Sequence, residues 1–268
     1  QLEEIINSGE EVLLCDCRFD LVDPSAGKNA YEESHIPGAI YVDLDHDMSG
    51  PKNGSNGRHP LPSPEAWAKT KTRLGITPNT LVVAYDKQGS VYASRLWWML
   101  KATGHAKVQV LDGGLDSWNG PMGTVPRTPI PATQAIEPRP YVGLVLVDEV
   151  VANLQTQKNA ILDARANDRF HGQNETLDPI GGHIPGAINR FFKDNLSATS
   201  FKSAEQLFQD FVELLGPIKP SEVIHQCGSG VTACHNLLAM ELAGLKGSRL
   251  YAGSWSEWCA DTNRPVET

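Results

Sequence analysis

The chain has 268 residues, of which 40% are hydrophobic, and a formal net charge of -9 at pH 7. This acidic balance argues against a general nucleic-acid surface, which needs a basic stripe, and no stretch approaches the roughly 18 apolar residues of a membrane span, so we expect neither partner. Five cysteines without paired C-x-x-C spacing do not indicate a disulfide framework and favour a reducing, cytoplasmic compartment.

Four patterned blocks follow one another in the first half of the chain. LLCDCRFD at 13–20 is a strand-like run that contains Asp16-x-Arg18, and SHIPGAIYVD follows at 34–43. LVVAYDKQGSVYASRLWWML at 81–100 joins a strand pattern to a helical one, and VLDGGLDSW ends the series at 110–118. The next segment is rich in proline, which predicts a stiff, extended linker over 121–141.

The same four blocks recur in the second half in the same order. They are AILDARANDRF, which contains Asp163-x-Arg165, then GHIPGAINRF, EVIHQCGSGVTACHNLLAM and LYAGSWSEW. The alignment sets Cys227 opposite Asp86. Matching blocks in one order indicate a tandem duplication, with one domain at 1–120 and the other at 142–268.

Both copies alternate short β-branched runs with helical patterns. The runs at 81–84 and 222–225 are typical strands, and 204–216 is a typical helix. The apolar residues that share one face of that helix are Leu207, Phe208, Phe211, Leu214 and Leu215. Alternation of this kind predicts an α/β fold in each domain, with a mostly parallel sheet and helices on both faces.

Cys227 lies between a predicted strand and a predicted helix, at the sheet edge where α/β folds collect ligands and reactive groups. A tight loop entering a helix turns backbone N–H groups inward, and the helix N-terminus adds about half a positive charge, so an anion such as a thiolate is stabilised there. Gly228 and Gly230 let the backbone curl around the sulfur, and Ser229 and Thr232 add hydroxyl donors. We interpret Cys227 as a nucleophile rather than a small buried hydrophobe.

Two other chemistries fit part of this loop. Gly228-x-Gly230-x-x-Ala233 satisfies the dinucleotide fingerprint, but the next strand lacks the acidic residue expected about 20 positions later. A cysteine phosphatase closes its anion-binding loop with an arginine, whereas this loop has Thr232 at that place and no basic residue. Dinucleotide binding stays a distant alternative, and we set the phosphatase aside.

Together the motifs resemble the tandem-domain rhodanese-like sulfurtransferases over nearly the whole chain. D-x-R and HIPGA occur in both copies, GSWSEW occupies 253–258, and CGSGVTA at 227–233 is similar to the loop of 3-mercaptopyruvate sulfurtransferases. The resemblance implies a degenerate first domain and a catalytic second domain. It also implies sulfur transfer from 3-mercaptopyruvate through a Cys227 persulfide to a thiol, cyanide or thioredoxin-like acceptor, without a metal or cofactor. Thiosulfate as the donor, and a non-catalytic binding module, are the alternatives.

The resemblance assigns further residues to the site. Arg169 matches an arginine that binds the acidic group of the donor. Asp45 and His59 match first-domain residues that act with the loop serine, here Ser229, in substrate activation. Within the loop we expect the donor to be bound by Gly228, Gly230, Val231 and Thr232.

The chain departs from the family pattern at one point. A second substrate arginine is expected between RF and GHIPG, but the stretch 171–182 contains none, and Arg190 or His171 are the candidates to replace it. A loop without basic residues suits a donor with one carboxylate better than the thiosulfate dianion. The charge pattern therefore favours 3-mercaptopyruvate.

The other cysteines are predicted to be passive. Cys15 and Cys17 form a C-x-C pair on a strand, but no further Cys or His pair with ligand spacing accompanies them, so core packing is favoured over a metal site. Cys234 lies at the start of the helix after the loop, and Cys259 lies near the chain end. A passive role is favoured for both over the alternative, in which one of them resolves an oxidised Cys227 by forming a disulfide.

Overall fold

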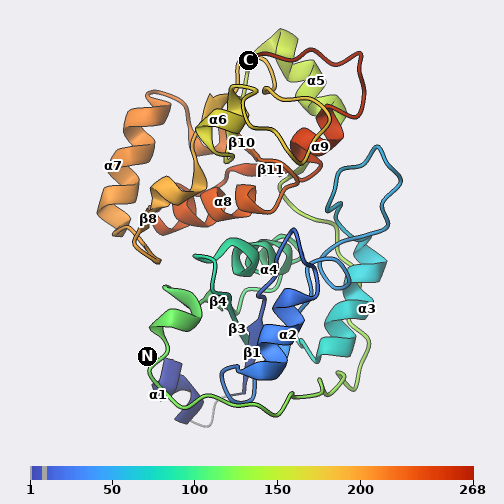
Figure 1. Cartoon of the computed structure of the whole chain (residues 1–268), viewed down its shortest axis with the longest axis vertical. Coiled ribbons are helices and arrows are strands. Elements are labelled where there is room, and N and C mark those ends of the chain that lie inside the picture. The colour runs from blue at the N-terminus through green and yellow to red at the C-terminus, as the bar shows by residue number, and fades with distance from the viewer. Residues whose placement is uncertain (1, 8–10) are drawn as a thin grey trace. The chain divides into compact units, whose positions relative to one another are not determined.

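The computed structural model describes residues 2–7 and 11–268 of the chain (Figure 1). These residues form two compact units, one from the described residues up to Gly50 together with Pro62–Val142, and the other from Pro51–Leu61 together with Gly143–Thr268. The proline-rich segment 121–141 belongs to the first unit, and the short segment 51–61 belongs to the second, although it lies within the first repeat. Among the described residues, no helix is both long and apolar enough to cross a bilayer.

The first unit is built on a four-stranded parallel sheet with the strand order β2-β1-β3-β4. Its strands are β1 (Val12–Asp16), β2 (Ile40–Tyr41), β3 (Leu81–Tyr85) and β4 (Val108–Val110). Its helices are α1 (Leu2–Asn7), α2 (Ala26–Glu33), α3 (Pro64–Leu74), α4 (Val91–Ala102) and the 3-10 helix η1 (Gly114–Ser117).

The second unit is built on a five-stranded parallel sheet with the order β5-β11-β10-β6-β7. Its strands are β5 (Leu144–Val145), β6 (Ala160–Asp163), β7 (Ile188–Asn189), β10 (Val223–Gln226) and β11 (Arg249–Tyr251), and β8 (Leu196–Ser197) pairs antiparallel with β9 (Ser200–Phe201). Its helices are α5 (Val147–Thr156), α6 (Asn167–Phe170), α7 (Ala204–Leu215), α8 (Thr232–Leu242), α9 (Ser254–Trp258), η2 (Phe192–Asn195) and η3 (Pro220–Glu222).

The duplication read from the sequence is also present in the strand order. β1 and β6 each end at the aspartate of a D-x-R motif, and each pairs on one side with the strand that follows HIPGA, β2 or β7. On the other side each pairs with the strand that precedes the Asp86 or Cys227 loop, β3 or β10. The predicted parallel α/β architecture is confirmed in both units.

Alternating side chains of the second sheet supply two cores, one on each face. Ile161 and Ile224 pack with α5 and α9, whereas their neighbours Leu162 and Val223 pack with α7 and α8. Successive residues of a strand point to opposite faces, so these continuous apolar runs need helices on both sides. This sandwich fixes the carboxyl end of β10, where Cys227 follows.

The predicted helix at 204–216 is present as α7, but its buried face is narrower than expected. Leu207, Phe211 and Leu215 are buried, whereas Phe208 is 41% exposed. The buried residues recur every four positions and form a single row against the second core. Phe208 follows Leu207 in the helix, so its side chain points away from this row.

Candidate active site

Cys227 directly follows β10, and α8 begins five residues later. Its side chain is buried, and its Sγ accepts a hydrogen bond from the Gly230 N–H at 3.1 Å. The Cys227 backbone is held from both sides, because its N–H donates to Ser254 Oγ at 3.1 Å and its carbonyl accepts from Trp255 N–H at 2.9 Å. The GSWSEW motif therefore positions the cysteine loop.

Close contacts surround both glycines of the loop, and at Gly230 they involve backbone atoms. Gly230 has φ of +77°, and a Cβ there would lie 2.3 Å from the Ala252 carbonyl oxygen, so both conformation and space demand glycine. At Gly228 a Cβ would lie 2.7 Å from Arg58 Nη2. The loop curls around the sulfur as the sequence predicts, with Val231 buried before α8 and Thr232 half-buried as its first residue.

The first unit has a loop of the same length, and this loop surrounds a carboxylate. Asp86 follows β3 as Cys227 follows β10, and in both units the helix begins five residues later. The Asp86 carboxylate accepts four backbone N–H hydrogen bonds of 2.8 to 3.0 Å, from Gln88, Ser90, Tyr92 and Ala93. Burial raises the pKa of Asp86 above its usual value although these bonds oppose it. The loop type is thus a cradle for an anionic group, which its own aspartate fills in the first unit.

His59 and Ser229 meet within the second unit, although 170 residues separate them. His59 Nδ1 and Ser229 Oγ lie 2.8 Å apart, and both residues are buried. Ser229 is two residues from Cys227, so a side chain that can transfer protons is hydrogen-bonded into the cysteine loop. The structure brings these two predicted residues together.

Asp45 lies in the first unit, in a turn after β2. Its backbone N–H donates to Asp43 Oδ1 at 2.8 Å, and its side chain is half-buried. The same turn is tied by Asp47, which accepts from the Asp43 N–H at 2.9 Å and pairs with Arg73. The part that Asp45 takes in catalysis stays a prediction.

Arg169 is held by two acidic residues from the stretch in which an arginine was missing. Its Nη2 lies 2.9 Å from both carboxylate oxygens of Glu175 and 3.6 Å from Asp178 Oδ2. Burial raises the pKa of Glu175, but hydrogen bonds from the Leu177 N–H and from Arg169 outweigh it, so the pKa is lowered overall. Arg169 Nη2 also lies 3.7 Å from the place of a Cβ on Gly228, which sets this guanidinium beside the cysteine loop.

Arg58 is the residue at this loop that sequence reasoning missed. It pairs with the buried carboxylate of Asp178, and its backbone N–H donates to Ser256 Oγ at 3.0 Å. The preceding Gly57 has φ of +88°, and a Cβ there would lie 2.8 Å from the Gly253 carbonyl oxygen. The segment 51–61 is therefore fitted closely against the loop that precedes α9. The only signal for this in the sequence is that Arg58 precedes His59.

The candidates named to replace the missing arginine have other partners within the second unit. Arg190 donates to Asp210 Oδ2 at 2.9 Å and to Asn195 Oδ1 at 3.0 Å, and its guanidinium stacks 4.9 Å from the Phe211 ring of α7. His171 contacts the rings of Phe170 and His183. The neutral loop expected from the sequence is thus flanked by guanidinium groups from other segments.

The D-x-R motifs are structural clamps in both units. Arg165 donates to both carboxylate oxygens of Asp163 at 2.6 to 3.1 Å and to the Gly182 carbonyl at 2.8 Å. Arg18 does the same with Asp16 and the Ser34 carbonyl. Each arginine ties a strand end to the turn that begins HIPGA. Because the clamp also occurs in the unit without a loop cysteine, it serves the fold first.

The remaining cysteines are buried free thiols. Burial raises the pKa of Cys15 and Cys17 far above the usual thiol value, and it raises the pKa of Cys259 to about 11. A thiol with such a pKa is a poor nucleophile at neutral pH. In the part of the chain that the structure describes, no group of three or more His, Cys, Asp or Glu residues is arranged to hold a metal ion.

Comparisons with known proteins identify the family of the chain. The model of the rhodanese-like domain matches residues 1–121 and 146–261. The chain is 44% identical to the "Probable 3-mercaptopyruvate sulfurtransferase" of Pseudomonas aeruginosa, over 97% of this chain and 94% of that protein. It is 37% identical to the thiosulfate sulfurtransferase of Mus musculus, over 86% of this chain and 79% of that protein.

A solved structure repeats the same likeness. The 3-mercaptopyruvate sulfurtransferase from Leishmania major is 30% identical and matches with a TM-score of 0.87, covering 98% of this chain and 74% of that one. The matches span both repeats, so the likeness concerns the whole duplicated architecture. It extends beyond the cysteine loop.

Proposed function

Because the chain belongs to the rhodanese-like family of sulfurtransferases, we propose that it transfers a sulfur atom from 3-mercaptopyruvate to a thiol, cyanide or thioredoxin-like acceptor through a persulfide on Cys227. The observation that carries the proposal is the Gly230 N–H at 3.1 Å from Cys227 Sγ, in a loop whose counterpart in the first unit surrounds a carboxylate. A sulfur anion at Cys227 is stabilised by the same inward N–H groups.

The reaction has two steps of covalent catalysis. In the first, the Cys227 thiolate attacks the donor sulfur, an S–S bond forms and the C–S bond of mercaptopyruvate breaks. The electron pair of that bond passes to carbon, which takes up the proton lost by the donor thiol and leaves as pyruvate. In the second step, cyanide or a thiolate attacks the outer sulfur, and the Cys227 thiolate is released.

Ser229 and His59 are placed to move the proton in the first step. Ser229 Oγ lies two residues from the nucleophile and 2.8 Å from His59 Nδ1, so a proton can pass between the donor thiol and the imidazole through the hydroxyl. We include Asp45 as the third member of this group. This assignment rests on the family pattern that Asp45 matches.

Arg169 and Arg58 are the proposed anchors for the donor carboxylate. Both guanidinium groups reach the loop at Gly228, and both are oriented by the buried Asp178. Each retains N–H groups that can pair with a carboxylate. Because Glu175, Asp178 and Asp163 balance Arg169, Arg58 and Arg165, the cluster as a whole is close to neutral, which suits a donor with one carboxylate better than a dianion.

The remaining parts of the proposal follow from this assignment. Residues 142–268 form the catalytic domain together with the contribution of 51–61, and residues 1–120 form a degenerate domain in which Asp86 replaces the nucleophile. The persulfide chemistry needs no metal or organic cofactor. Five free thiols suit a reducing compartment such as the cytoplasm.

Donor preference is tested by comparing kcat/KM for 3-mercaptopyruvate and for thiosulfate with cyanide as the acceptor. We expect mercaptopyruvate to be preferred, and we expect Arg169→Gln to lower its kcat/KM by about 10- to 100-fold, because a charged hydrogen-bonded pair is lost. Arg249→Gln is the matched control, since Arg249 also has a carboxylate partner, Glu149 at 3.3 Å. A higher kcat/KM for thiosulfate would overturn the donor assignment and make the chain a thiosulfate sulfurtransferase.

A further inference from the structure

Lys71 is a buried amine in the first unit that the proposed sulfur transfer does not use. It lies in the last turn of α3 and is only 4% exposed. Its Nζ lies 3.4 Å from Thr103 Oγ1 and 6.0 Å from the centre of the Trp67 ring. No carboxylate in the described part of the chain forms an ion pair with it. A buried ammonium group without an anionic partner is costly, so this position favours an incoming anion.

The Thr103 hydroxyl does not satisfy this amine. Its oxygen also accepts from Trp67 Nε1 at 3.2 Å, and its proton is donated to the Met99 carbonyl at 2.8 Å. The Lys71 ammonium has three donors, of which this long contact uses one. Two N–H groups therefore remain for a ligand.

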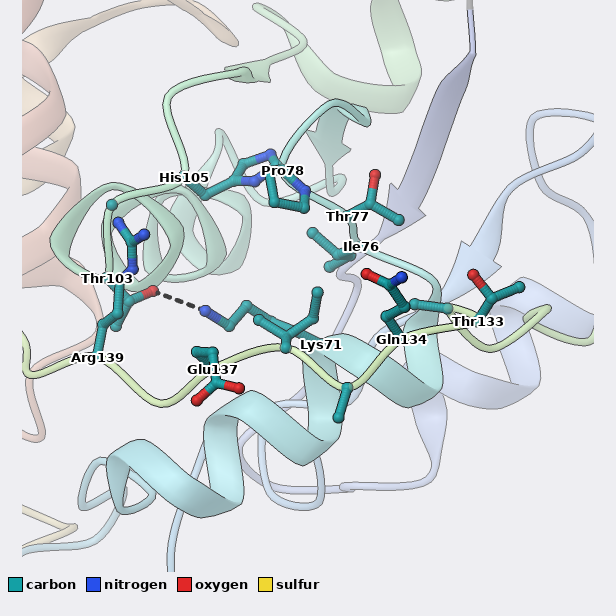
Figure 2. Close-up of a pocket in the computed structure, with 14 residues that line it drawn as sticks. Lys71, Ile76, Thr77, Pro78, Thr103, His105, Thr133, Gln134, Glu137 and Arg139 are labelled. Atoms are coloured by element: carbon teal, nitrogen blue, oxygen red, sulfur yellow. Dashed lines mark hydrogen bonds between the residues drawn. The ribbon is translucent and has the colours of Figure 1, made fainter.

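A pocket of about 310 Å³ opens beside Lys71 (Figure 2). Its walls come from the end of α3 and the turn after it, the residues that follow α4, and the extended segment 132–139. Figure 2 shows the Lys71 amine directed toward Thr103, with Arg139 on the same side and the carboxylate of Glu137 turned away. The volume is at the lower end of that of small-molecule sites.

Arg139 adds a second cation to this pocket. Its Nη1 lies 2.7 Å from the place of a Cβ on Gly104, whose φ is +83°, so the guanidinium packs over a position that only glycine leaves open. Burial lowers the pKa of Lys71, and the charge of Arg139 lowers it further. Two cations that repel each other are both stabilised by one anion bound between them.

We propose that this pocket binds a small organic carboxylate, whose acid group pairs with Lys71 and Arg139 and whose apolar part lies on Ile76, Pro78 and Ile136. The apolar wall is what favours an organic acid over a bare oxyanion. His105 is not part of the recognition, because its Nε2 is directed to the Lys107 carbonyl at 3.1 Å.

The test is a titration of the whole protein with butyrate, followed by the backbone amide signals of residue 104 and residues 133–137 in NMR spectra. We expect saturable shifts with a dissociation constant of about 1 mM. Lys71→Met should weaken binding at least about tenfold, and Arg139→Gln, at an exposed position, should weaken it in the same direction. Lys69→Met is the matched control, because Lys69 is an exposed lysine of the same helix, and it should bind as the wild type does.

Three outcomes would overturn the proposal. The first is the absence of saturable shifts at these amides, and the second is unchanged binding by both Lys71→Met and Arg139→Gln. The third is an equal response to a control ligand. Equal binding of butylamine would mean that the pocket does not select a negative charge, and equal binding of sulfate would mean that it does not select an apolar group. Because the readout is binding in the first unit, the result is independent of the sulfur-transfer assay.

Discussion

The last residues of β10 place a buried imidazole two positions before the nucleophile. His225 is inaccessible to solvent, and neither of its ring nitrogens has a hydrogen-bond partner. Burial lowers its pKa from 6.5 to about 3. The neutral ring therefore packs as an apolar group, on the side of the sheet where Val223 meets α7 and α8.

This burial predicts acid sensitivity of the fold. As pH falls below 6.5, the unfolded chain binds a proton on His225 that the folded chain does not bind until about pH 3, so stability falls with pH in that window. Between pH 7 and pH 5 the loss from this residue should be about 2 kcal/mol. Urea unfolding at both pH values should show that His225→Leu loses about that much less than the wild type. Equal losses in the two proteins would show that His225 is not buried in its neutral form.

The sequence predicted functional residues only where they belong to a recognisable motif. Cys227, Ser229 and Arg169 stand in short recognisable patterns, and the structure places all three around one loop. Arg58 was missed because a lone arginine in a glycine-rich segment gives no local signal. The guanidinium groups beside the loop were not visible for the same reason, since they come from segments outside the loop's own sequence.

At the scale of elements, the strand-to-helix loop is the unit that the duplication preserves. In both copies four residues separate the key residue, Asp86 or Cys227, from the helix that follows. In both, a later backbone N–H donates to the carbonyl of the key residue, from Leu115 at 2.8 Å to Asp86 and from Trp255 at 2.9 Å to Cys227. The sequence periodicity predicted these strands and helices well. It predicted a wider buried face for α7 than the structure has. The spacing of apolar residues does not show how much of that face the neighbouring elements cover.

The loop geometry predicts a specific sensitivity to substitution at Gly230. Gly230→Ala combines a left-handed conformation with a Cβ placed 2.3 Å from the Ala252 carbonyl oxygen, so it should cost about 2 kcal/mol or more beyond the strain of φ alone. Gly244→Ala is the control, because Gly244 has φ of +78° and nothing within 4 Å of an added Cβ. Denaturant unfolding of both variants measures the difference. Similar losses would mean that the Ala252 contact yields easily.

On the scale of the whole molecule, the chain is a tandem repeat whose units are not simply consecutive. The repeat and its boundary region were visible in the sequence, because four blocks recur in order. The placement of 51–61 in the second unit was not visible, because it depends on the Arg58 pair with Asp178 and on the close contact of Gly57 with Gly253. Such contacts are made by single residues in a segment without periodicity.

A double-mutant cycle tests this attachment. Arg58→Met and Asp178→Asn should each destabilise the protein, and their effects should be coupled by about 1 kcal/mol or more, because the Asp178 side chain is 3% exposed and its partner is partly buried. The coupling is measured from urea unfolding of the four proteins. Additive effects would show that the pair does not hold the segment.

The central claim is that Cys227 carries the transferred sulfur, and intact-protein mass after incubation with 3-mercaptopyruvate tests it most directly. The account predicts a gain of one sulfur atom in the wild type and in Cys259→Ser, which removes another buried thiol, and no gain in Cys227→Ser. Addition of cyanide should return the mass to its starting value. A protein that gains no sulfur from mercaptopyruvate or thiosulfate, or one that gains it equally in Cys227→Ser, would contradict the account.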